Sequence, residues 1–138
     1  MTEAVKIVAK RQEQSKADKQ ATLDRLRSKK RRTKTISVQI DGEEMELTFA
    51  ALSSHELDRL QSKHVPTTEQ KARGLAFNPD TFAPALVAAC SIEPELTETD
   101  TKEIWTSESW STGELNYLFD TVSNLCMEGL NIPFTGTD

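Results

Sequence analysis

The fold of this chain is decided by residues 35–49, which read TISVQIDGEEMELTF. Apolar and polar residues alternate on both sides of Asp41-Gly42. Such alternation is typical of half-buried strands, and Asp-Gly favours a tight hairpin turn because Gly tolerates positive φ. The stretch therefore predicts a β-hairpin with one apolar face. Because an isolated hairpin is only marginally stable in water, helices or another copy must cover that face.

The sequence after the hairpin predicts helices, because capping patterns recur along it. In a capping box, the N-cap hydroxyl and the side chain at N3 each bond the other's backbone N–H. Pairs at this spacing are Ser53 and Glu56, Thr67 and Gln70, Thr97 and Asp100, and Ser111 and Glu114. The pair Thr67 and Gln70 is expected to open a short turn that ends at Gly74. The pair Thr97 and Asp100 precedes Ile104 and Trp105.

The pattern after Ser111 is the strongest amphipathic helix in the chain. Its apolar residues recur at spacings of three and four, which places them on one helical face. Gly129 is expected to cap this helix, and Pro133 prevents its continuation. The apolar face predicts the core of the domain: Leu115, Leu118, Phe119, Val122, Leu125 and Cys126.

A second start signal, Asn78-Pro79-Asp80-Thr81, precedes the apolar run from Phe82 to Cys90. We expect this helix to begin at Asp80 or Thr81, because Pro84 would then lie in the first turn, where its missing N–H costs little. Pro94 should end the helix near Ser91.

The predicted fold class is mainly α with an N-terminal β-hairpin, an α+β arrangement. A hairpin and helical domain is expected over residues 35–132, with a basic arm over 1–34 and a flexible tail over 133–138. The arm favours helix by composition, but its apolar positions are sparse. A frayed helix and an extended arm that becomes ordered on a partner both remain open.

Charge is distributed unevenly along the chain. Residues 1–34 carry twelve Lys or Arg against four Asp or Glu, whereas the remainder carries five against eighteen. The densest basic run is Lys29, Lys30, Arg31 and Arg32. It permits a contact with nucleic acid, but the first 48 residues contain no aromatic side chain for base stacking. A solvated run, or a contact with an acidic protein surface, is the favoured interpretation.

No catalytic or cofactor signature is found. The five glycines are scattered, so no phosphate-binding loop is predicted, and neither an enzyme nor a cofactor site is expected. Cys90 and Cys126 lie in apolar patterns without metal-ligand spacing and are expected to be buried thiols. His55 and His64 are expected at the surface, His64 near a helix C-terminus. No apolar run approaches the roughly 20 residues that cross a bilayer, and no signal peptide is seen, so a cytoplasmic protein is expected.

Two stretches resemble the tail assembly chaperones of siphophages that infect actinobacteria and related hosts. The first is residues 77–90, FNPDTFAPALVAAC, and the second runs from WSTGEL, residues 110–115, through the amphipathic helix to Leu130-Asn131. The hairpin followed by helices is also similar to the layout of that family. The basic arm matches no motif of the family.

The resemblance implies a protein of the host bacterial cytoplasm that is not expected in the mature virion. It would bind the tape measure protein, keep it soluble and recruit tail tube subunits. It would be the short form of a pair whose longer form arises by frameshifting, and the two forms would associate. A helical client needs an apolar groove. The candidate contact residues are Met45, Leu47, Phe49, Phe77, Phe82, Trp105 and Trp110, although core packing is the favoured role of both tryptophans.

Other functions remain open at this stage. The chain could be a structural component of the virion, such as a connector or minor tail protein. It could also be a small nucleic-acid-binding regulator that uses residues 25–34. Self-association through the hairpin edge is a further expectation, because an unpaired strand edge is a template for further pairing.

Overall fold

The computed structural model describes residues 3–127 of the chain, which divides into two compact units, Met1–Lys30 and Arg31–Asp138. The first unit contains helix α1, Glu3–Arg27. From residue 14 onward its side chains are exposed except for the half-buried Leu23. Of the two states left open for this segment, the structure has the helix. Because so few of the side chains from residue 14 onward are covered, this part of α1 gains little from tertiary packing within its own unit.

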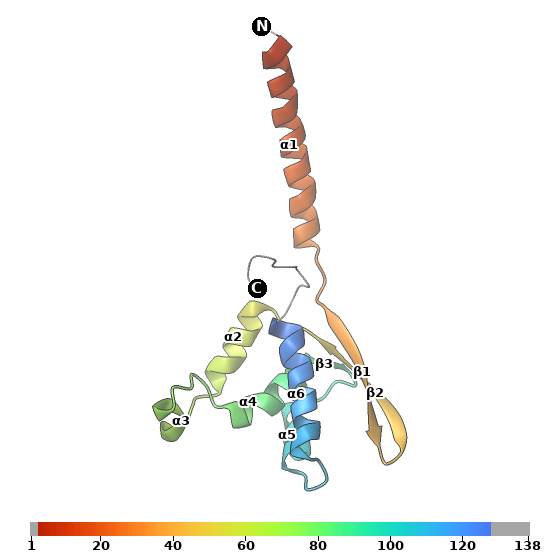
Figure 1. The fold of residues 1–138 in the computed structure, drawn as a ribbon, viewed down its shortest axis with the longest axis vertical. Helices are drawn as coiled ribbons and strands as arrows, with labels where there is room; N and C mark the ends of the chain where they lie inside the picture. The colour runs from red at the N-terminus through yellow and green to blue at the C-terminus, as the bar shows by residue number, and fades with distance from the viewer. Residues whose placement is uncertain (1–2, 128–138) are drawn as a thin grey trace. The chain divides into compact units, whose positions relative to one another are not determined.

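The second unit has the predicted α+β fold (Figure 1). Strands β1, Thr33–Ile40, and β2, Glu43–Ala50, form the predicted antiparallel hairpin. Asp41 and Gly42 both have positive φ, 51° and 86°, as a type I′ turn requires. A third strand, β3, Ser91–Glu93, pairs antiparallel with β2 and gives the order β1-β2-β3. The sequence pattern did not predict β3, because three residues are too few for a period to be visible.

Five helices complete this unit over the described residues, and the predicted capping boxes form. The helices are α2, Ser54–Lys63; α3, Thr68–Ala72; α4, Pro79–Cys90; α5, Glu98–Thr106; and α6, Thr112–Met127. The Ser111 hydroxyl accepts the N–H of Glu114 at 3.1 Å, and the Glu114 carboxylate accepts the N–H of Ser111 at 2.9 Å. The predicted caps at Gly129 and Pro133, and the predicted tail, lie outside the described residues.

The predicted start of α4 was wrong. The helix begins at Pro79, because the Asn78 side chain accepts the N–H of Asp80 and Pro is well suited to the first helical position. Pro84 is therefore inside the helix, in its second turn. Its carbonyl accepts a 2.8 Å bond from the hydroxyl of Thr101, a buried residue of α5. The helix ends at Cys90, next to Ser91, as predicted.

The core lies where α4 and α6 pack on each other and on one face of the sheet. Figure 1 shows α6 beside the hairpin, with α4 and α5 behind it. The amphipathic stripe of α6 supplies three of the buried side chains, as its spacing predicts. The core side chains are Ile36, Phe49, Phe82, Leu86, Val87, Cys90, Leu118, Val122 and Leu125.

Candidate protein-binding groove

The apolar face of the hairpin is buried at one end only. In the strand register Phe49 lies opposite Lys34, Leu47 opposite Ile36, and Met45 opposite Val38, and all point to one face. Phe49 and Ile36, far from the turn, are buried in the core, whereas Leu47 and Val38 are half-buried. Met45, nearer the turn, is 49% exposed. The apolar face therefore emerges from the core toward the turn.

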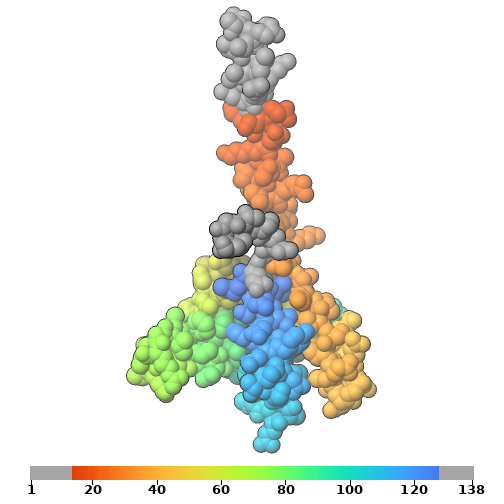
Figure 2. Space-filling view, viewed as in Figure 1, coloured from red at the N-terminus to blue at the C-terminus, as the bar shows by residue number. Residues whose placement is uncertain are grey.

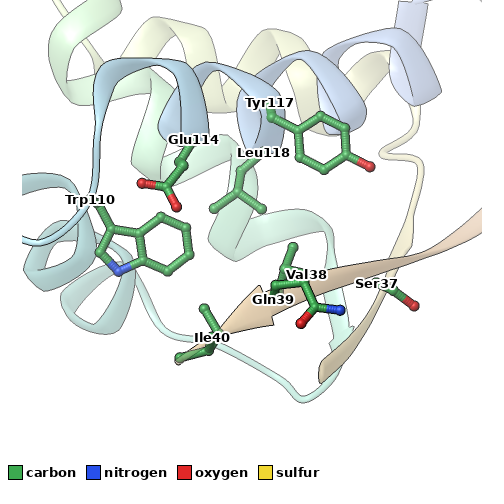
Figure 3. A pocket seen from close by; sticks show the side chains of 8 residues that line it. All are labelled: Ser37, Val38, Gln39, Ile40, Trp110, Glu114, Tyr117 and Leu118. Carbon is green, nitrogen blue, oxygen red and sulfur yellow. The ribbon is translucent and has the colours of Figure 1, made fainter. Parts of the chain in front are cut away.

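A hollow of about 260 Å³ lies between this end of β1 and helix α6. Figure 3 shows Trp110 and Leu118 on one side of the hollow and the strand that carries Val38 and Ile40 on the other. Tyr117, also in the wall, is 49% exposed. The remaining wall is polar and comes from Ser37, Gln39 and Glu114.

A second hollow, of about 290 Å³, continues along the same helix, and Tyr117 lines both. Its other walls are Arg32, Lys34, Asp120, Thr121, Asn124 and Leu125. We call the two hollows together the hairpin groove. Because a helix rises 1.5 Å per residue, the part of α6 along this groove, from Glu114 to Leu125, spans roughly 17 Å. Figure 2 shows α6, in blue, and the hairpin, in orange, side by side on one face of the surface.

The two ends of the hairpin groove differ in charge. Glu114 stands at the end near the hairpin turn, where Glu43 lies opposite Ile40 in the register. The backbone N–H and the hydroxyl of Ser111 lower the pKa of Glu114, so this carboxylate is ionised at neutral pH. Arg32 and Lys34 line the far end, together with Asp120. A bound segment would therefore meet an acidic end and a mixed, more basic end.

The structure separates the seven candidate contact residues. Met45 and Leu47 share the hairpin face that leads into the groove, and Trp110 lines it. Phe49 and Phe82, at 1% and 3% exposure, are core residues that a partner cannot reach in this fold. They are removed from the candidate surface because the sheet and α4 turn these side chains inward.

Phe77 and Trp105 are also not part of the groove. The Phe77 ring packs on Phe82 with a centroid distance of 4.8 Å, and Phe82 packs edge-on against Phe119 at 6.4 Å. Trp105 of α5 is half-buried and packs against the core. Sequence reasoning missed Val38, Ile40 and Tyr117. The alternating pattern of the hairpin places Val38 and Ile40 on its apolar face and could have indicated them. Tyr117 lies outside the apolar stripe of α6, so no sequence pattern indicated it.

The basic run is divided between the two units. Arg31 forms a 2.6 Å ion pair with Glu56, the N3 residue of the α2 capping box. The Ser53 N–H and hydroxyl, with a smaller effect from Arg31, lower the pKa of Glu56. Arg32 lines the hairpin groove. Lys29 and Lys30 belong to the first unit, where the Lys29 ammonium donates to the Lys30 carbonyl at 3.1 Å.

His64 is half-buried, so it agrees only in part with its predicted place at the surface. It caps the C-terminus of α2, as expected, but its side chain is only 11% exposed because the chain turns there onto α4. Its Nδ1 lies 2.9 Å from the Thr81 hydroxyl, and its Nε2 lies 3.5 Å from a Glu98 oxygen. His55 is exposed, as expected.

Cys90 is buried and Cys126 half-buried, and both are free thiols. In the part of the chain that the structure describes, no group of three or more His, Cys, Asp or Glu side chains could hold a metal ion. Across residues 3–127, no helix is both long and apolar enough to span a membrane. No protein-family model, curated protein or solved structure matches this chain.

Proposed function

We propose that this protein is an assembly chaperone that holds an amphipathic helical segment of a client protein in the hairpin groove. The observation that carries the proposal is the groove itself. It is an elongated hollow between β1 and α6, with Trp110 and the half-exposed Tyr117 in its wall and the apolar hairpin residues opposite. Its length of roughly 17 Å suits about three turns of a client helix.

The residue types of the groove favour reversible protein binding. Tyr and Trp are enriched at binding hot spots because they combine large apolar surfaces with a polar group. An amphipathic helix anchors in such a groove through residues at i, i+3, i+4 and i+7. Covering these anchors removes the apolar stripe of the client from water, which keeps an unassembled client soluble.

The particular chaperone that we propose is a tail assembly chaperone of a siphophage, in the short form. The support is the resemblance of residues 77–90 and 110–131 to that family, together with the groove. The client would be the tape measure protein in the host cytoplasm, with tail tube subunits recruited later and the longer frameshifted form as a further partner. The chain would be absent from the mature virion.

The proposal is tested by co-expressing the protein with fragments of the tape measure protein of the same phage and measuring how much fragment stays soluble. Tyr117→Glu and Met45→Glu place a charge on the apolar surface while replacing half-exposed side chains. Each should abolish client solubilisation and leave the circular dichroism spectrum unchanged. The matched control is Val65→Glu, because Val65 is 65% exposed in the α2–α3 connection and lines neither hollow.

Two results would contradict the proposal. If the groove variants solubilise the client as well as Val65→Glu does, the client does not bind there. If mass spectrometry of purified phage particles detects the protein in stoichiometric amounts, it is a structural virion component. Retention on nucleic acid at low salt that is lost on deleting residues 1–34 would instead favour the regulatory function.

Self-association also has an observation in its favour. β1 is an outer strand of the sheet, and in the described residues no strand pairs with its other edge. An open edge of this kind can pair with a second chain. Light scattering after gel filtration over a range of concentrations should show a dimer that Gln39→Pro abolishes. Ile40 and Glu43 flank the two-residue turn, so Ile40 and Val38 bond to β2, whereas the N–H of Gln39 points to the open edge. Proline at position 39 removes a donor from that edge without removing a bond of the hairpin.

A further inference from the structure

The two cysteines, 36 positions apart in sequence, are neighbours in the fold. Cys90 is the last residue of α4, and Cys126 lies in the last turn of α6. Their sulfur atoms are 3.7 Å apart, and the backbone N–H of Leu52 donates to the Cys126 sulfur at 3.3 Å. The ends of α4 and α6 and the backbone of Leu52 therefore meet at this pair of thiols. Neither cysteine lines the hairpin groove.

The two thiols have different surroundings. Cys90 is 1% exposed, whereas Cys126 is half-buried and is therefore the sulfur that a reagent can reach first. The hydrogen bond from Cys90, followed by that from the Leu52 N–H, lowers the pKa of Cys126 to about 6. The same hydrogen bond, together with burial, raises the pKa of Cys90. The contact between the two sulfur atoms therefore favours the thiolate form at Cys126 and the protonated form at Cys90.

We propose that Cys90 and Cys126 are an oxidation site that reacts with small disulfides of the glutathione type and closes to an intramolecular disulfide. Cys126 is the attacking residue and Cys90 the resolving residue. The geometry carries this assignment, since the half-buried Cys126 lies directly beside the buried Cys90, with 3.7 Å between their sulfur atoms. A thiolate of this kind is the nucleophile in thiol–disulfide exchange.

The chemistry has two exchange steps. The Cys126 thiolate attacks one sulfur of the small disulfide, whose S–S bond breaks, and one small thiolate leaves and takes a proton from water. Cys90 then gives its proton to water, and its thiolate attacks the Cys126 sulfur of the mixed disulfide. The second small thiolate leaves and takes a proton from water. The two protein thiols are oxidised together by two electrons, and the small disulfide is reduced to two thiols.

Closing the bond requires the sulfur atoms to approach from 3.7 Å to about 2.05 Å. Cys126 lies near the end of α6, at its half-buried side, so a small rotation of its side chain accomplishes part of this movement. The bond would join the C-terminal ends of the two core helices. Because it closes a long loop, it should raise the melting temperature by roughly 10 °C.

The experiment treats the purified full-length protein with oxidised glutathione, blocks the remaining thiols in denaturant and identifies the products by peptide mass spectrometry. We expect a Cys90–Cys126 cross-link within the monomer. Cys90→Ser should stop at one glutathione on Cys126, and Cys126→Ser should take up none. With limiting iodoacetamide, the wild-type protein should be alkylated at Cys126 at least about tenfold faster than at Cys90.

The oxidation and the limiting-iodoacetamide measurement both use the wild-type protein, so they decide the question even if a substitution unfolds the chain. The proposal is overturned if both thiols stay free after oxidation, which would leave them as a hydrogen-bonded core pair. Cross-links between chains in place of the internal one would also overturn it. Equal alkylation rates at the two cysteines would contradict the assigned roles.

Discussion

Phe82 shows how the surroundings of a residue decide between a packing role and a binding role. Sequence reasoning placed it both in an apolar helix and among the candidate contacts. In the fold it is 3% exposed, and its ring is surrounded by those of Phe77, Phe119 and His64. Aromatic pairs in this offset or edge-on geometry add to the free energy gained by burying the ring.

Phe82→Ala should lower the free energy of unfolding by about 3–5 kcal/mol, because it removes a buried ring and leaves a cavity. Urea denaturation followed by circular dichroism measures the change. Tyr117→Ala is the control, since that ring is 49% exposed and its loss should cost less than about 1 kcal/mol. A small effect at Phe82 would contradict its role as a packed core residue.

At the scale of residues, sequence periodicity identified the apolar face of each element. It did not show which residues of that face other elements bury. Met45 and Phe49 occupy equivalent positions in the alternation, yet one is 49% and the other 1% exposed. The difference arises because the helices cover only the end of the hairpin that is distant from the turn. Sequence reasoning could not assign Tyr117 to the groove, because the opposite wall of the groove is formed by β1, which is far away in sequence.

At the scale of elements, Gly42 fixes the hairpin turn. Its φ of +86° is a conformation that residues with a Cβ rarely adopt, although open space surrounds the position. Gly42→Ala should therefore cost about 1–2 kcal/mol through backbone strain alone. Thermal or urea unfolding gives the value.

Gly113 provides the matched control for the turn. It lies in the first turn of α6, and the nearest atom to an added Cβ would be the Ser111 hydroxyl at 3.9 Å. Gly113→Ala should be neutral, or stabilising by up to about 1 kcal/mol, since Gly loses more conformational freedom in a helix than Ala does. If Gly42→Ala and Gly113→Ala change the free energy of unfolding equally, a side chain at position 42 does not strain the turn.

The helix caps make stability depend on acid pH. Hydrogen bonds from Ser53, Thr97 and Ser111 lower the pKa values of Glu56, Asp100 and Glu114 from ordinary values of 4.5, 3.8 and 4.5. A lowered folded-state pKa adds stability that is present above the ordinary value and is lost as pH falls through the lowered value. Unfolding free energy should therefore decrease from just above pH 4.5 downward.

The triple variant Glu56→Gln, Asp100→Asn and Glu114→Gln should flatten this dependence. Urea denaturation at several pH values between 6 and 3 measures it. The variant should be less stable than wild type at pH 6, with the two curves converging as the wild-type carboxylates become protonated. If the wild-type slope persists in the variant, other acidic groups cause the acid sensitivity.

At the scale of the whole molecule, the division after Lys30 predicts that the body folds without the arm. Deleting residues 1–30 should leave a cooperative unfolding transition with a melting temperature within about 3 °C of the full chain, since the core residues all lie in the second unit. Calorimetry measures this, and circular dichroism should show less helix per chain. A non-cooperative or strongly shifted transition would mean that the arm is part of the folded body.

The sequence by itself determined the local structure of this protein. The alternation around Asp41-Gly42, the capping boxes and the stripe of α6 each depend on residues within one or two turns of each other. These short-range interactions gave the hairpin, most helix starts and much of the core. The start of α4 was misplaced because two prolines, Pro79 and Pro84, compete for the favourable first-turn position, and the cap at Asn78 decides between them.

Tertiary structure alone decided which residues meet across the fold. The pairing of β3 with β2, the partial burial of His64, the full burial of Phe82 and the 3.7 Å approach of Cys90 to Cys126 all join segments distant in sequence. The hairpin groove is of the same kind, because its two walls come from β1 and α6. Sequence patterns report the preference of each segment for burial, whereas the partner of each buried face is fixed only when the whole chain packs.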